Sequence, residues 1–179
     1  MNPAFAALAA IGLLRVSELA YSQWTARRLL ARGATLVRDD GYAILVTVHA
    51  AWFVSCAGEV VIRGIRFGTW TWVGGAVLLV GSMLRYWSMA KLGERWNTRV
   101  YVLADAPLVR TGPYRVMPHP IYLGVAMELV GLPLAFGLWW TAAALLPLHA
   151  VAVLRRIGKE KRALAPLRSA EPKATQARR

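Results

Sequence analysis

Residues 119–154 read HPIYLGVAMELVGLPLAFGLWWTAAALLPLHAVAVL, a stretch that contains no lysine or arginine and a single acidic side chain. A helix needs about 20 apolar residues to cross the hydrocarbon core of a bilayer. Gly131-Leu132-Pro133 and Gly137 interrupt the stretch, and helix breakers are tolerated in a membrane where neighbouring helices satisfy the backbone. The pattern therefore predicts a tight helical hairpin, slightly shorter than two full spans.

Three further apolar segments precede this hairpin, at about residues 3–24, 41–62 and 69–91. Of the 179 residues, 57% are hydrophobic, whereas soluble domains are usually about 45–50% apolar. The sequence thus predicts an all-α integral membrane protein with five transmembrane helices. Residues 1–164 form one membrane domain, and residues 165–179 form a basic tail whose composition predicts disorder.

The formal net charge is +13, and its distribution predicts the orientation of the chain. The connections after the first three segments carry four, two and five Lys or Arg residues, and the tail carries nine. The positive-inside rule then places the N-terminus outside and the C-terminus in the cytoplasm. Attraction to anionic lipid explains the remaining basic character, so no nucleic-acid partner is expected. The first segment lacks a basic n-region, because its first cation is Arg15, and it is interpreted as a retained span rather than a signal peptide.

Polar groups within the apolar segments constrain the kind of site. Cys56 is the only cysteine, which excludes an internal disulfide and a zinc site with two cysteine ligands, and no metal is expected. Arg15 and Glu18 are three residues apart, so they share a helix face and can pair. Glu128 is expected to face a neighbouring helix or a substrate cavity. His149 is interpreted equally well as a structural histidine or as a site residue.

The sequence predicts a functional site at the connection between the third segment and the hairpin, at about residues 92–118. It mixes cations, aromatics and short apolar runs, as expected of a lid or pocket wall, and an amphipathic segment resting on lipid headgroups is the alternative. Pro118 and Pro120 restrict the backbone around His119 at the start of a helix, where free N–H groups favour a ligand carboxylate. Beyond the hairpin, Arg156 and Glu160 are one helical turn apart.

Taken in order, these motifs resemble the isoprenylcysteine carboxyl methyltransferase family. The elements are G-P-Y-R-V-M-P-H-P-I-Y-L-G at 112–124, the apolar hairpin, and R-I-G-K-E at 156–160. RVSELAYSQWTARRLLARGA at 15–34, HAAWF at 49–53 and LRYWSMAKLGERW at 84–96 are similar to a small bacterial branch of that family. The resemblance covers about residues 15–164. Pro118 stands where the family usually has Arg, and Lys161 where it often has a second Glu.

The resemblance implies an integral-membrane enzyme that uses S-adenosylmethionine, here in a bacterial inner membrane. Members of the small branch are often associated with type III polyketide synthases and methylate phenolic lipids, so a prenylcysteine-like carboxylate and a phenolic lipid are both candidate acceptors. The implied cytoplasmic cofactor pocket comprises Ala106, Pro107, Leu108, Val109, Tyr114, His119, Pro120, Ile121, Tyr122 and Glu160. Arg156 matches a position that holds the substrate. No residue is assigned as a separate catalytic base.

Two other classes of protein remain open from the sequence. A membrane reductase that acts on sterol-like lipids with NADPH would share a helical hairpin with a cytoplasmic pocket. A non-catalytic scaffold or small transporter would share the hydrophobicity, the basic tail and the intramembrane charges. Cofactor binding separates these alternatives from the methyltransferase.

Overall fold

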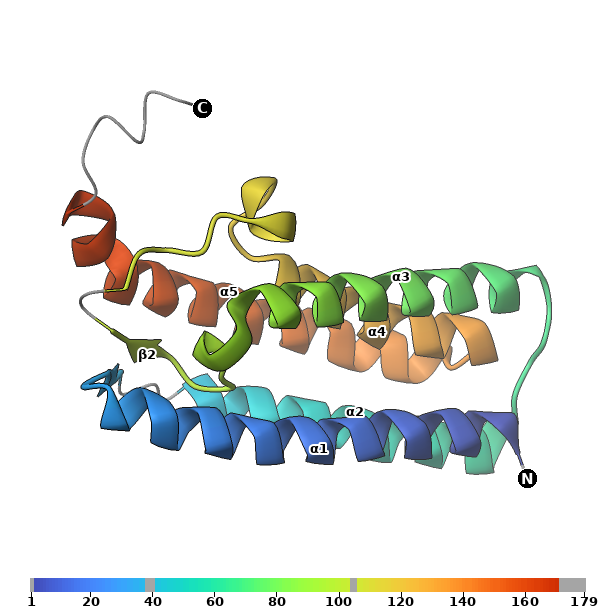
Figure 1. Cartoon of the computed structure of the whole chain (residues 1–179). Helices are drawn as coiled ribbons and strands as arrows, with labels where there is room; N and C mark the ends of the chain where they lie inside the picture. Colours follow the sequence, from blue (N-terminus) through green and yellow to red (C-terminus); the bar gives the residue numbers. More distant parts are fainter. Residues whose placement is uncertain (1, 38–40, 104–105, 171–179) are drawn as a thin grey trace.

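The computed structural model describes residues 2–37, 41–103 and 106–170. The long helices are α1 (Pro3–Ala31), α2 (Gly41–Arg63), α3 (Thr69–Leu92), α4 (Pro120–Phe136) and α5 (Trp139–Ala170). They run roughly parallel or antiparallel to one another in a single bundle, with the N-terminus at one end and the C-terminal end of α5 at the other (Figure 1). The described parts of the connection between α3 and α4, residues 93–103 and 106–119, lie toward the end opposite the N-terminus, which we call the loop end.

Four helices are long and apolar enough to cross a membrane, namely α1, α2, α3 and α5. The prediction of an all-α integral membrane protein is confirmed. At 17 residues, α4 is shorter than the roughly 20 that a full span requires. The fifth full span therefore stays a prediction. The first helix continues seven residues beyond the predicted limit of 24, because Ala26 to Ala31 are good helix formers.

The predicted hairpin is present, but its turn consists of Gly137 and Leu138 only. Gly137 has a φ of 71° and caps α4, and its N–H donates to the carbonyl of Pro133. The helix itself continues through Gly131, Leu132 and Pro133, which we interpreted from the sequence as part of the interruption. At the other end of the bundle's first helix, the Asn2 side-chain oxygen accepts from the N–H of Ala4 at 3.0 Å and caps the start of α1.

Close packing of α3 on α4 explains why the glycines of this hairpin do not break it. A Cβ added to Gly81 would stand 2.9 Å from the carbonyl oxygen of Gly124, and one added to Gly124 would stand 2.8 Å from that of Gly81. Small residues let two membrane helices approach closely, where dispersion contacts between the helices supply the stabilisation. The two helices therefore meet backbone to backbone along a glycine-lined seam.

Short elements connect α1 to the loop end of the bundle. Strand β1 (Thr35–Leu36) pairs antiparallel with β2 (Tyr101–Val102), with Thr35 opposite Val102. Two 3-10 turns, η1 (Gly93–Arg95) and η2 (Gly112–Arg115), flank β2 along the chain. No strand was predicted here, although residues 99–103 alternate weakly.

The C-terminal helix extends further than the sequence indicated. We predicted that the membrane domain ends at residue 164 and that a disordered tail begins at residue 165. Instead, α5 runs to Ala170, so the first six residues of the predicted tail are helical. The rest of that tail, residues 171–179, lies outside the described residues, as does Arg38, one of the cations in the orientation count.

Candidate functional site

A large cavity opens inside the loop end of the bundle. Its volume is about 1020 Å³, at the upper limit of the roughly 300–1,000 Å³ that ligand pockets usually have. Its walls come from all five long helices and from the connection between α3 and α4. The cavity is long enough to follow α5 from His149 to Leu164. A volume of this size is large enough for two small-molecule ligands.

Ten of the eleven residues that we assigned to the site from the sequence line this cavity. They are Ala106, Pro107, Leu108, Val109, Tyr114, His119, Ile121, Tyr122, Arg156 and Glu160. The exception is Pro120, which is fully buried at the first turn of α4 and is not part of the wall. Its position at the helix start fits its fixed φ, so it shapes the site through the backbone.

Four of these residues, from α4, α5 and the residue before α4, form one polar cluster. The Tyr122 hydroxyl donates to Glu160 Oε2 at 2.8 Å and accepts from Arg156 Nε at 3.1 Å. His119 Nδ1 lies 3.9 Å from the same Glu160 oxygen. The Arg156 side chain is 4% exposed and also donates from Nη2 to the Thr98 carbonyl at 2.5 Å. Two motifs about 35 residues apart in sequence are therefore directly bonded in the fold.

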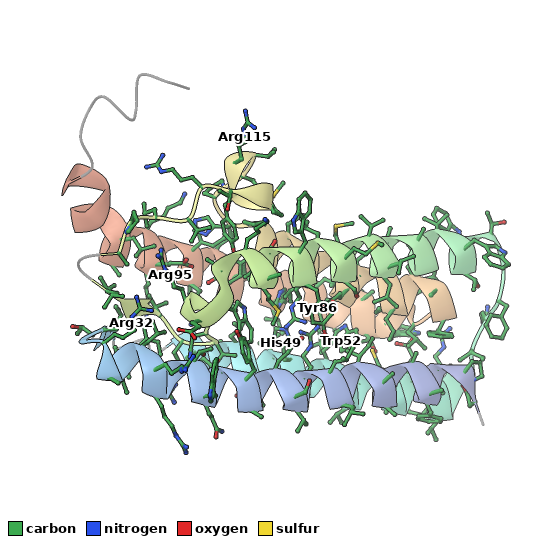
Figure 2. The ribbon with its side chains drawn as sticks, viewed as in Figure 1. Arg32, His49, Trp52, Tyr86, Arg95 and Arg115 are labelled. Atoms are coloured by element: carbon green, nitrogen blue, oxygen red, sulfur yellow. The ribbon has the colours of Figure 1, made fainter. Side chains whose placement is uncertain are left out.

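The segment 106–109 forms another wall and is held by a cation that was not predicted to belong to the site. Arg95, at the end of η1, donates from Nη1 to the Pro107 carbonyl at 2.5 Å. Figure 2 shows Arg95 at the loop end of the bundle. The bond ties the wall to the end of α3, which gives an irregular segment a fixed position. Arg115, by contrast, is exposed and points outward from η2 (Figure 2).

Tyr114 lies in η2 and contributes a neutral hydroxyl to the cavity. Burial, and to a smaller extent the Glu160 carboxylate, raises the pKa of Tyr114 well above its ordinary value. Burial acts this way because it penalises the phenolate form. The side chain therefore stays protonated at physiological pH and can donate or accept a hydrogen bond.

The connection after α3 is fastened to α1, which closes one side of the cavity. Ser22 Oγ and Thr98 Oγ1 are 2.8 Å apart, and Thr25 Oγ1 donates to the Trp96 carbonyl at 2.8 Å. Asn97 Nδ2 donates to the Ser22 carbonyl at 2.6 Å. The small hydroxyl side chains on α1 thus let the connection after α3 pass close to the helix and form hydrogen bonds with it. These residues were not predicted, because Ser and Thr in an apolar segment carry no distinctive signal.

Further from the loop end, the cavity meets a network of buried charges. Arg15 Nη1 pairs with Glu18 Oε2 at 2.8 Å, as the three-residue spacing predicted. Glu18 also pairs with Arg85, and Glu128 pairs with Arg15 and accepts from Ser82 Oγ at 2.8 Å. The two arginines and two glutamates sum to zero charge. This neutrality explains how α1, α3 and α4 can hold four ionised groups within the membrane.

Two histidines complete the wall away from the loop end. The rings of His49 on α2 and His149 on α5 have centroids 4.9 Å apart and an interplanar angle of 79°. His49 Nδ1 is 2.9 Å from the Leu45 carbonyl, and both histidines line the cavity. Figure 2 shows His49 between the layer of α1 and α2 and the layer of α3 and α4.

Comparisons with known proteins agree with the motif pattern. The profile of the isoprenylcysteine carboxyl methyltransferase (ICMT) family matches residues 72–166. The Bacillus subtilis uncharacterized protein YpbQ is 32% identical over 151 residues, which is 84% of this chain and 89% of that protein. An uncharacterized protein of Haemophilus influenzae is 26% identical over 168 residues, 93% of this chain and 96% of that protein. No solved structure matches the chain significantly.

The matched region contains both halves of the polar cluster. It begins within α3 and extends through α4 into the part of α5 that carries Arg156 and Glu160. The family match thus covers more than half of the chain and includes the residues that meet at the cavity. The chain belongs to the isoprenylcysteine carboxyl methyltransferase family, a family of membrane methyltransferases.

Proposed function

We propose that the protein is an integral-membrane methyltransferase that uses S-adenosylmethionine and methylates the oxygen of a lipophilic acceptor. The acceptor is a prenylcysteine-like carboxylate or a phenolic lipid. The observation that carries the proposal is the direct bonding of Tyr122, Arg156 and Glu160 at a cavity of about 1020 Å³, within the part of the chain that the family profile matches.

The residues at the loop end fit the chemical groups of S-adenosylmethionine. The Glu160 carboxylate is a partner for an ammonium group, and Arg156 and the first free N–H groups of α4 suit a carboxylate. The apolar side chains of Leu108 and Val109 suit the faces of an adenine ring. Bound there, S-adenosylmethionine would supply an electrophilic methyl group on its sulfonium.

The protein's own contribution is to position the two ligands and to exclude water. Arg156 is buried and fixed by Tyr122 and by the Thr98 carbonyl, so it presents a cation in one orientation. The segments 93–103 and 106–109, held by Arg95 and by α1, cover the cavity on its loop side. Fixed geometry and a dry site are the main sources of rate enhancement when the methyl group is already activated.

The distribution of cations supports a cytoplasmic location for the loop end. The C-terminal end of α1, the connection 93–119 and the end of α5 all lie there, and together they carry most of the Lys and Arg residues. By the positive-inside rule the N-terminus is then outside, and the cofactor enters the cavity from the cytoplasmic side. We propose that the membrane is a bacterial inner membrane. The acceptor reaches the same cavity laterally from the bilayer.

Binding of S-adenosylhomocysteine to the purified protein, measured by calorimetry in detergent, tests this function. We expect micromolar binding by the wild type and a loss of at least tenfold in His119→Ala and in Glu160→Ala. Glu94→Ala is the matched control, because Glu94 is a half-exposed carboxylate that pairs with Arg28 away from the cavity. Its affinity should equal that of the wild type.

The same experiment separates the proposal from its two alternatives. A folded wild-type protein that binds NADPH but not S-adenosylhomocysteine would indicate a membrane reductase. A folded protein that binds neither would indicate a scaffold or transporter. Equal losses in Glu160→Ala and Glu94→Ala would mean that the cluster on α4 and α5 does not form the cofactor site.

A further inference from the structure

His149 is a buried polar side chain that the proposed cofactor site leaves unused. It is 4% exposed, and neither ring nitrogen has a hydrogen-bond partner among the described residues. A buried polar group without a partner costs roughly 1–3 kcal/mol, so such groups are rare in folded proteins. The ring lines the cavity, which is where a ligand can supply the partner.

His49 supports the same interpretation from the neighbouring helix α2. Its Nδ1 faces the Leu45 carbonyl at 2.9 Å, and a carbonyl can only accept, so Nδ1 carries the proton. In the neutral imidazole, Nε2 is then an acceptor. The edge-to-face contact with His149 fixes the two rings relative to each other. Two helices thus present imidazoles to one part of the cavity.

This part of the cavity differs in charge from the loop end. His149 precedes Arg156 by seven residues, which places it about 10 Å further from the loop end along the same face of α5. The charged residues near it, Arg15, Glu18 and Arg85 with Glu128 behind them, are paired with one another and sum to zero. The cations Arg95, Arg99 and Arg110 line the cavity through the loop-end connection.

We propose that His149, oriented by His49, is the acceptor-binding residue that selects an uncharged hydroxyl group on a lipophilic ligand. A neutral hydroxyl can donate to an unprotonated imidazole nitrogen and accept from a protonated one, so that each of the two histidines gains one hydrogen-bond partner. A carboxylate at the same place would gain a counter-ion only if one of the imidazoles took up a proton, and burying that ion pair is costly. Phe53, Val125 and Val153 line the cavity alongside and provide apolar contact for the ligand's chain.

The inference rests on the proposed methyl transfer only in naming the ligand as the acceptor. It favours the phenolic lipid over the prenylcysteine-like carboxylate. It does not require that the oxygen bound by His149 be the one that is methylated, since a ring with two oxygen substituents can present one to each end of the cavity.

Binding of three matched probes to the full chain in nanodiscs tests it. The probes are 3-pentadecylphenol, its methyl ether and 3-pentadecylbenzoate, which share one chain and differ in the polar group. Each affinity is expressed per mole fraction of probe in the nanodisc lipid, so that differences in partition between the probes cancel. The variants are His149→Leu, His149→Gln and, as the control on the same cavity face, Val153→Ala. S-adenosylhomocysteine binding is measured on every sample.

We expect the wild type to bind the phenol at least tenfold more tightly than the ether or the benzoate. His149→Leu should lose that preference, His149→Gln should keep part of it through its amide, and Val153→Ala should weaken all three probes alike. The variants should keep the wild-type affinity for S-adenosylhomocysteine, because His149 lies outside the cofactor cluster.

Two results would overturn the inference: a wild type that prefers the benzoate, or a His149→Leu variant that keeps the wild-type preference for the phenol. If His149→Leu does not fold, His149→Ala replaces it, and a folded His149→Ala protein that keeps the full preference overturns the inference in the same way. A wild type that selects the phenol through His149 but does not bind S-adenosylhomocysteine would leave this inference standing and refute the methyltransferase proposal.

Discussion

At the scale of single residues, the Tyr122 hydroxyl is the centre of the polar cluster. It bridges a cation and a carboxylate on neighbouring turns of α5, donating to Glu160 and accepting from Arg156. Without this bridge, the buried Arg156 and the partly exposed Glu160 would lose a neutral partner that fixes their orientation. The residue therefore links the two motifs that were assigned separately, from the sequence, to cofactor and substrate.

Tyr122→Phe should weaken S-adenosylhomocysteine binding about tenfold while leaving the fold intact. A hydrogen bond to a charged group contributes about 1.5–3 kcal/mol, and the ring itself still packs. Calorimetry on the detergent-purified protein measures the effect. Tyr86→Phe is the control, since Tyr86 donates to Glu18 at 2.8 Å and does not line the cavity. Equal affinities for the two variants would show that the bridge does not shape the cofactor site.

The role of a single residue can be predicted when the residue belongs to a recognisable sequence motif, and not when its role depends on how the helices pack. His119, Tyr122, Arg156 and Glu160 belong to spaced motifs, and ten assigned residues do line one cavity. His149 carried no such signal, because its importance follows from which face of α5 meets α2. Glu59 is a similar case: its carboxylate accepts from the N–H groups of Trp140 and Thr141 and caps α5, a contact 81 residues away in sequence.

At the scale of elements, the glycines on α3 and α4 decide how closely the two helices pack. In an apolar segment, a glycine signals either a break or a close contact, and the sequence alone does not separate these. We interpreted Gly131 from the sequence as part of an interruption, whereas a Cβ there would stand 2.6 Å from the backbone nitrogen of Leu78. Helix ends are predicted better, because Gly137 and Pro120 act through their own backbone.

Gly81→Ala should lower the thermal unfolding midpoint, and Gly75→Ala should not. An added Cβ at Gly81 meets the backbone of α4, which can yield only by separating the helices. At Gly75 the same Cβ meets nothing within 4 Å, and alanine is the better helix former by about 1 kcal/mol. Thermal unfolding of both variants in one detergent measures the difference. A Gly75→Ala variant as unstable as Gly81→Ala would contradict the seam between α3 and α4.

At the scale of the whole molecule, α1 is attached to the bundle largely through polar contacts. Its lipid-facing surface is long and exposed, while Glu18, Ser22 and Thr25 are buried on the inner side. Glu18 bonds to Arg85 on α3, and Arg15 bonds to Glu128 on α4. In a bilayer, apolar contact with lipid is as favourable as contact with another helix, so paired polar groups are an effective way to join helices.

Arg85→Met should therefore destabilise the whole protein and not merely one contact. The substitution leaves Glu18 and Glu128 with only Arg15 as a shared cation, so a carboxylate is buried without its full partner set. Removing one member of a buried pair costs about 3–5 kcal/mol. Unfolding of the purified protein, followed by circular dichroism against denaturing detergent, measures that loss.

The control and a second variant distinguish a shared network from a set of independent pairs. Arg28→Met breaks the pair with Glu94, whose side chains are 51% and 43% exposed, and exposed pairs contribute at most about 1 kcal/mol. The double variant Glu18→Gln with Arg85→Met removes both charges together, so it should recover part of the stability that Arg85→Met loses. A double variant whose loss of stability equals the sum of the losses in Glu18→Gln and Arg85→Met alone would mean that the two residues act separately, and that α1 is joined to the bundle by something other than this network of four charges.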